Sequence, residues 1–145
     1  MIKKYDSDAS LNQKILEGIN ILADNVASTL GPRGRNVILQ ESGKRPIVTK
    51  DGVTVAQFVT LQDPIQNAGA EIIKQASAET NNSAGDGTTT ATVLARAILR
   101  KAQAHLTAGA SPIELKRGID KAVVEVVQNL GKLAKPISSI EDIEH

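Results

Sequence analysis

The spacing of apolar residues constrains the fold of this 145-residue chain more than any other feature. In four long segments these residues recur three or four positions apart, which places them on one face of an α-helix. We expect helices at about 10–30, 64–80, 88–106 and 112–135. The expected buried faces are Leu11, Ile15, Ile19, Leu22, Val26 and Leu30 in the first helix, Ile65, Ala68, Ile72, Ala76 and Thr80 in the second, and Leu115, Ile119, Val123, Val126, Leu130 and Leu133 in the fourth.

Start signals accompany three of these segments. Ser10 with Gln13 is typical of a capping box, in which each side chain bonds the other residue's backbone N–H. Asp63-Pro64 and Ser111-Pro112 each combine a capping side chain with proline at the first helical position. Gly18 lies inside the first pattern at a cost of about 1 kcal/mol relative to alanine, so we expect another element to pack close to it.

A different periodicity follows the first helix. Residues 37–40 and 46–49 are short β-type runs around a polar loop, which predicts a β-hairpin. Because an isolated hairpin is marginally stable in water, we expect it to pack on something or to recruit another strand. The available strand is 2–5, from the same or a neighbouring copy. The expected fold class is mainly α, with four helices and one small β-hairpin.

Composition excludes several classes of site. The chain has no cysteine and only two histidines, so disulfide scaffolds, thiolate zinc sites, cysteine nucleophiles and histidine-rich metal sites are excluded. A formal net charge of +1, with one Tyr, one Phe and no Trp, argues against a nucleic-acid partner. The sequence has no secretory signal and no stretch of transmembrane length, so we expect a cytoplasmic protein and no membrane partner.

The segment 85–90, Gly-Asp-Gly-Thr-Thr-Thr, carries the strongest chemical signal. Glycines let a backbone approach an oxyanion, and the N-terminus of the following helix offers free N–H groups and partial positive charge. Asp86 would repel phosphates unless a cation such as Mg²⁺ lies between them, so it fits best as a metal ligand. The simpler alternative is a turn with Thr88 as an ordinary N-cap.

Two further turns could converge on this loop. Residues 29–36 follow the first helix with a glycine-punctuated turn, whose carbonyls suit a cation. Its alternative reading is a plain left-handed helix stop. Asp51, after the second hairpin strand, is a candidate general base or water-orienting carboxylate, and the alternative is an ordinary Asp-Gly turn. His105 has no partner in the sequence and is not expected to be catalytic.

Four segments together resemble the group I chaperonins of the GroEL type. They are 29–37 (TLGPRGRNV), 49–56 (TKDGVTVA), 84–94 (AGDGTTTATVL) and 115–123 (LKRGIDKAV), in the family's order and spacing. The resemblance implies an ATP-dependent protein-folding chaperone, a ring subunit whose ATPase activity requires Mg²⁺ and K⁺. It implies Asp51 as the catalytic residue that helps to activate water, Asp86 as the Mg²⁺ ligand, and the backbone of Thr29 and Lys50 at the K⁺ site. The implied ATP-binding residues are Thr29, Leu30, Gly31, Pro32, Lys50, Asp86, Gly87, Thr88, Thr89 and Thr90.

The resemblance also predicts domains and partners. Residues 1–133 correspond to the N-terminal part of the equatorial, ATP-binding domain and 134–145 to the start of the intermediate domain. The apical domain and the C-terminal equatorial segment are absent from these residues, so we expect little or no ATP turnover from this chain alone. Expected partners are ring neighbours, through hairpin 37–49 and the N-terminal strand, and, for the full-length protein, non-native polypeptides and a cochaperonin. The alternative is a truncated, non-hydrolysing assembly or binding module with an exposed apolar patch.

Overall fold

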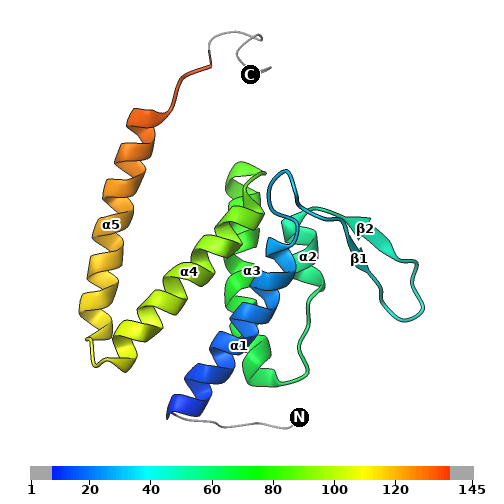
Figure 1. Ribbon diagram of the computed structural model, residues 1–145, viewed down its shortest axis with the longest axis horizontal. Helices are drawn as coiled ribbons and strands as arrows, with labels where there is room; N and C mark the ends of the chain where they lie inside the picture. The colour runs from blue at the N-terminus through cyan, green and yellow to red at the C-terminus, as the bar shows by residue number, and fades with distance from the viewer. Residues whose placement is uncertain (1–7, 138–145) are drawn as a thin grey trace. The chain divides into compact units, whose positions relative to one another are not determined.

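The computed structural model describes residues 8–137 and divides the chain into two units, Met1–Lys101 and Ala102–His145. The elements, labelled in Figure 1, are α1 (Asp8–Ala27), β1 (Val37–Leu39), β2 (Ile47–Thr49), α2 (Gly52–Phe58), α3 (Pro64–Ala84), α4 (Thr88–Thr107) and α5 (Pro112–Leu133). The predicted class, mainly α with one small hairpin, is confirmed. No helix within residues 8–137 is long and apolar enough to cross a membrane.

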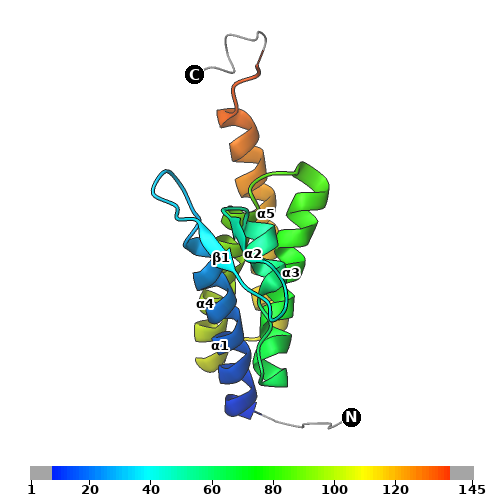
Figure 2. The ribbon, with the colours of Figure 1, turned by 90° about the vertical axis from the view of Figure 1, so that its right-hand side faces the viewer.

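The core of the first unit forms where α1 packs along α3, as Figure 2 shows. Aliphatic side chains from both helices and from α2 fill it, with partly buried side chains of α4 against them. The fully enclosed members are Ile19, Leu22, Val26, Val55, Ala56, Ala70 and Ile73. The predicted α1 face is therefore correct in its central part, Ile19 to Val26.

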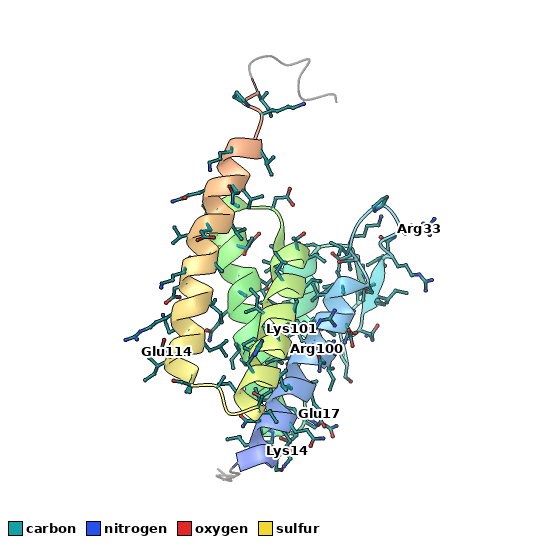
Figure 3. The ribbon with its side chains drawn as sticks, turned by 60° about the vertical axis from the view of Figure 1, so that its left-hand side comes forward. Lys14, Glu17, Arg33, Arg100, Lys101 and Glu114 are labelled. Carbon is teal, nitrogen blue, oxygen red and sulfur yellow. The ribbon has the colours of Figure 1, made fainter. Side chains whose placement is uncertain are left out.

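Two glycines let the backbones of α1 and α3 approach closely. A Cβ atom on Gly18 would lie 1.8 Å from the carbonyl oxygen of Gln66, and one on Gly69 would lie 2.2 Å from that of Ile15. Beside this crossing, the Gln66 Nε2 donates a hydrogen bond of 3.0 Å to Glu17, which Figure 3 labels on α1. The expectation that an element packs against Gly18 is confirmed.

The ends of α1 differ from the prediction. The helix already includes Asp8, so Ser10 lies within its first turn and is not the N-cap. It ends at Ala27, and Leu30 lies in the following turn with 45% of its surface exposed. Beyond the helix end, the N–H and the hydroxyl of Thr29 both donate to the Val26 carbonyl, at 3.1 and 2.7 Å.

The hairpin is present where the sequence predicts it. Strands β1 and β2 are antiparallel, with Val37 opposite Thr49 and Leu39 opposite Ile47. Leu39 is buried and Val48 is exposed, so one face of the hairpin packs on the rest of the first unit. Within residues 8–137 the sheet has only these two strands, and the predicted N-terminal strand 2–5 lies outside the described residues.

A fifth helix, α2, was not predicted. It is seven residues long, and its β-branched residues Val53, Thr54 and Val55 favour a strand when considered locally. Two tertiary effects favour the helix instead. Asp51 caps its N-terminus, and Val55 and Ala56 are buried in the core.

The start of α3 is confirmed, and its predicted buried face is wrong. Asp63 Oδ1 accepts hydrogen bonds from two backbone N–H groups of the first turn, at 2.8 and 3.2 Å. Ile72, predicted to be buried, is 47% exposed. The buried face instead consists of Gly69, Ala70, Ile73 and Ser77. Three of its four members are small because α1 lies close to this face, whereas the predicted stripe runs about one position before it. The helix also continues to Ala84, past the predicted end near Thr80, and Gly85 terminates it at a φ of 71°.

In the second unit, α5 begins where the sequence predicts, but its apolar side chains are less buried than predicted. The Ser111 hydroxyl accepts from the Glu114 N–H at 3.5 Å, and the helix runs to Leu133. No residue of α5 is buried, although its stripe was expected to be core; Leu130, for example, is 59% exposed. The described part of this unit holds only the end of α4 besides α5 and a short tail to residue 137, so it supplies no second long helix to cover the stripe.

Candidate functional site

Three turns of the first unit line one cleft of about 260 Å³. The turn after α1, the link from β2 to α2, and the turn from α3 to α4 all contribute to it. Its lining residues are Thr29, Leu30, Gly31, Lys50, Asp51, Gly52, Asp86, Gly87, Thr88, Thr89 and Thr90. Of the predicted site residues, only Pro32 does not line the cleft. Arg33 follows it on the same turn, and Figure 3 shows its side chain pointing away from the helices.

The first turn is compact and leaves its backbone open toward the cleft. Gly31 has a φ of 72°, in the left-handed region that favours glycine, and a Cβ there would meet no atom within 4 Å. The Gly34 N–H donates to the Gly31 carbonyl at 2.9 Å, which closes the turn. A Cβ on Gly34 would lie 2.1 Å from the Thr29 carbonyl oxygen, so glycine is required there. The early stop of α1 thus gives room for a ligand beside Gly31.

The second turn holds a carboxylate at the start of α2. Asp51 Oδ2 accepts a hydrogen bond from the Thr54 N–H at 3.0 Å and another from the Thr54 hydroxyl. The hydroxyl bond has the largest effect and lowers the pKa of Asp51; burial opposes it, and the N–H groups of Thr54 and Val53 lower the pKa further. Asp51 is therefore ionised at neutral pH. Asp51 both caps α2 and lines the cleft, because an N-cap side chain can still face solvent.

The third turn presents the N-terminus of α4 to the cleft. Gly85 and Gly87 have φ values of 71° and 77°, and the Ala91 N–H donates to the Gly87 carbonyl at 2.9 Å. Gly87 thus occupies the capping position, and Thr88 is the first helical residue and not the ordinary N-cap of the simpler alternative. Since glycine has no side chain, the first N–H groups of α4 remain available to an anion.

Thr89 joins the three turns. Its hydroxyl oxygen lies 3.3 Å from the Thr29 hydroxyl oxygen, so the first and third turns share a hydrogen bond. A Cβ on Gly52 would lie 2.3 Å from the same Thr89 oxygen, so the second turn also touches it. Sequence reasoning did not select Gly52 as a site residue. The signal was its place directly after Asp51, since glycine permits a backbone approach that no other residue allows.

The donors and acceptors of the cleft fit a phosphate chain with a cation. Backbone N–H groups of α4, threonine hydroxyls and the Lys50 ammonium attract anions, whereas Asp51 and Asp86 attract cations. No group of three or more His, Asp or Glu that could hold a metal ion occurs within residues 8–137. A cation at Asp86 would therefore take its other ligands from phosphate oxygens and water, as Mg²⁺ usually does.

The comparison with known protein families finds a match over most of the chain. The family model described as the TCP-1/cpn60 chaperonin family matches residues 22–144. That span covers most of the chain and includes every residue that lines the cleft.

Proposed function

This chain belongs to the TCP-1/cpn60 chaperonin family, and we propose that its cleft is the phosphate-binding part of a Mg-ATP site. The observation that carries the proposal is the convergence of three turns, far apart in sequence, on one polar cleft with Thr89 at their junction. In the complete protein, the site would couple ATP hydrolysis to the folding of non-native polypeptides. The group I resemblance of the sequence agrees with this proposal.

The chain's own groups would bind the phosphates. The open backbone at Gly31 and Gly87 permits close approach, and the first N–H groups of α4 donate to phosphate oxygens. Hydroxyls of Thr88, Thr89 and Thr90 add further donors, while Lys50 offsets negative charge as a mobile cation. We also propose the backbone of Thr29 and Lys50 as ligands for K⁺, because carbonyl oxygens suit such a cation.

Asp86 would hold the divalent cation. Its Oδ1 accepts from the Gly87 N–H at 2.6 Å, which fixes the carboxylate beside the N-terminus of α4. A bound Mg²⁺ would neutralise the phosphate charge that builds up during phosphoryl transfer. Asp51 would then accept a hydrogen bond from the attacking water and orient its lone pair toward the γ-phosphorus. Since its pKa is lowered, Asp51 acts mainly by orienting the water and less as a strong base.

The resemblance to the group I chaperonins also supports a contact between the hairpin and a neighbouring subunit of a ring. In the described residues, hairpin β1–β2 has only its own two strands, and Ile38, Ile47 and Val48 are each more than half exposed. We propose that the hairpin pairs with a neighbouring copy by strand addition. Cochaperonin and substrate contacts belong to this proposal only for the full-length protein.

Isothermal titration of the chain with Mg-ATP tests the proposed site. We expect binding in the micromolar range, about −8 kcal/mol. Binding should weaken strongly when Mg²⁺ is chelated or in Asp86→Asn. A matched control is Asp120→Asn, which removes an exposed carboxylate of α5 that pairs with Lys116 and should leave affinity unchanged. Equal affinity in all three chains, or no binding at all, would contradict the proposal.

A second candidate is a non-hydrolysing assembly or binding module. The observation that favours it is the exposed apolar stripe of α5, including Val123, Val126 and Leu130. Size-exclusion chromatography combined with the titration separates the two candidates. Self-association without nucleotide binding would favour the module, and nucleotide binding favours the ATP site.

A further inference from the structure

Both hydrogen bonds from Thr54 go to one oxygen of the Asp51 carboxylate. The Thr54 N–H lies 3.0 Å from Asp51 Oδ2, and the Thr54 hydroxyl donates to the same oxygen. The other oxygen, Oδ1, is therefore not used by Thr54. Asp51 is exposed and lines the cleft, whereas Thr54 is half-buried.

The hydroxyl bond is more than helix capping requires. An N-cap side chain stabilises a helix by accepting from a backbone N–H of the first turn, and the Thr54 N–H already provides that bond, with the Val53 N–H as a weaker influence on the same carboxylate. Threonine hydroxyls inside helices usually bond backward to a carbonyl of the preceding turn. Two others in this chain do so: Thr80 bonds to the Ala76 carbonyl and Thr92 to the Thr88 carbonyl, each at 2.9 Å. Thr54 instead uses its hydroxyl on a carboxylate.

Two donors on one oxygen also restrict the rotation of the carboxylate. A single bond from a backbone N–H lets the group swing about the acceptor, while a second donor from a different direction removes that freedom. The donor itself is held firmly, because a β-branched side chain in a helix has few χ1 rotamers. The charged groups that share the cleft with Asp51 are Lys50 and Asp86, and neither has a hydrogen bond to it among the described residues.

We propose that Thr54 is a positioning residue, whose hydroxyl holds the Asp51 carboxylate so that Oδ1 points into the cleft toward the attacking water. This inference rests on the proposed ATP site, and deepens it by assigning the residue that orients its water-binding carboxylate. Thr54 itself touches no reacting atom. Its contribution is expected only where the geometry of attack matters, because pre-set orientation acts on the transition state.

The first experiment measures the Asp51 side chain in the full 145-residue chain without nucleotide. Three-bond NMR couplings to its β-protons report the χ1 rotamer. We expect one rotamer in the wild type and in Thr54→Ser, which keeps the hydroxyl, and averaged couplings in Thr54→Val. The matched control is Thr60→Val, which removes an exposed threonine hydroxyl outside the cleft. If Thr54→Val does not fold, as judged by circular dichroism, Thr54→Ala replaces it, since alanine keeps the capping N–H.

The second experiment compares two ligands by titration, Mg-ATP and Mg-ADP with aluminium fluoride, which mimics the transferring phosphoryl group. Thr54→Val should weaken the fluoride complex about tenfold more than Mg-ATP, and Thr54→Ser should restore it to within about twofold. An unchanged rotamer in Thr54→Val, or equal losses for both ligands, would overturn the inference. If the wild type binds neither ligand, the proposed function fails, and with it the role of Thr54 toward an attacking water; the rotamer measurement then decides only whether the Thr54 hydroxyl orients Asp51.

Discussion

Replacing Gly52 with alanine tests the junction of the three turns. The new Cβ would lie 2.3 Å from the Thr89 hydroxyl oxygen, 3.0 Å from the Thr89 nitrogen and 3.1 Å from the Thr88 hydroxyl oxygen. A rotation of the Thr89 side chain relieves the first contact but breaks its hydrogen bond to Thr29. The contact with the Thr89 nitrogen is relieved only when the starts of α2 and α4 move apart.

Two opposing effects set the size of the change. Alanine is favoured over glycine in a helix by about 0.5–1 kcal/mol, whereas forcing extra volume into a packed site costs about 1–3 kcal/mol. Gly52 does not have a positive φ, so its backbone tolerates alanine and only the packing opposes it. We expect a net loss of about 1 kcal/mol in the free energy of unfolding, and a loss of Mg-ATP affinity because the N-terminus of α4 is displaced.

Gly118→Ala supplies the matched control. Gly118 also lies in a helix, α5, and a Cβ there would meet no atom within 4 Å. Gly118→Ala should therefore raise the free energy of unfolding by about 0.5–1 kcal/mol and leave nucleotide affinity unchanged. Urea unfolding followed by circular dichroism measures the stabilities, and isothermal titration measures the affinities. If Gly52→Ala is as stable as Gly118→Ala and binds Mg-ATP normally, the packing argument is wrong.

Three further predictions concern the core and the cap. Gly18→Ala should destabilise the first unit by about 3 kcal/mol or more, because its Cβ would meet backbone atoms of Gln66, which cannot rotate away; a normal urea midpoint would contradict this. Ile73→Ala, at a fully buried position, should cost about 2–5 kcal/mol in the same assay, whereas the exposed Ile72→Ala should cost far less. The pKa of Asp51 is lowered in the folded state, so its ionised form contributes its full stabilisation at pH values above the ordinary pKa of 3.8. This contribution is lost as the pH falls through the lower pKa of the folded state. Thermal unfolding between about pH 2 and 6 should therefore show a smaller acid-induced loss in Asp51→Asn than in the wild type, and identical profiles would refute the assignment.

Local sequence rules predicted the long helices well. The cap at Asp63, the hairpin at 37–49 and the close approach at Gly18 follow from backbone chemistry that acts within a few residues. Ser10 shows their limit, since its capping pattern lies inside a helix that starts earlier.

Features set by packing were missed. α2 is helical because its core contacts outweigh β-branched propensity, and the buried face of α3 is set by how closely α1 approaches. For the cleft, local chemistry pointed to the three turns, and the resemblance to the chaperonins implied ten of the eleven lining residues. That Thr89 touches both Thr29 and Gly52 is a distance between remote segments, which no local pattern encodes.

The glycine crossing of α1 and α3 has a consequence at the far end of both helices. α1 leads into the turn that holds Thr29, and α3 leads into the turn that holds Asp86. A slip of one residue would shift either helix end by about 1.5 Å along its axis. Because Gly18 and Gly69 each face a carbonyl of the opposite helix, such a slip would drive a side chain into that carbonyl. The two glycines thus fix the position of α1 along α3, and in this way they set the distance between the two turns that follow these helices.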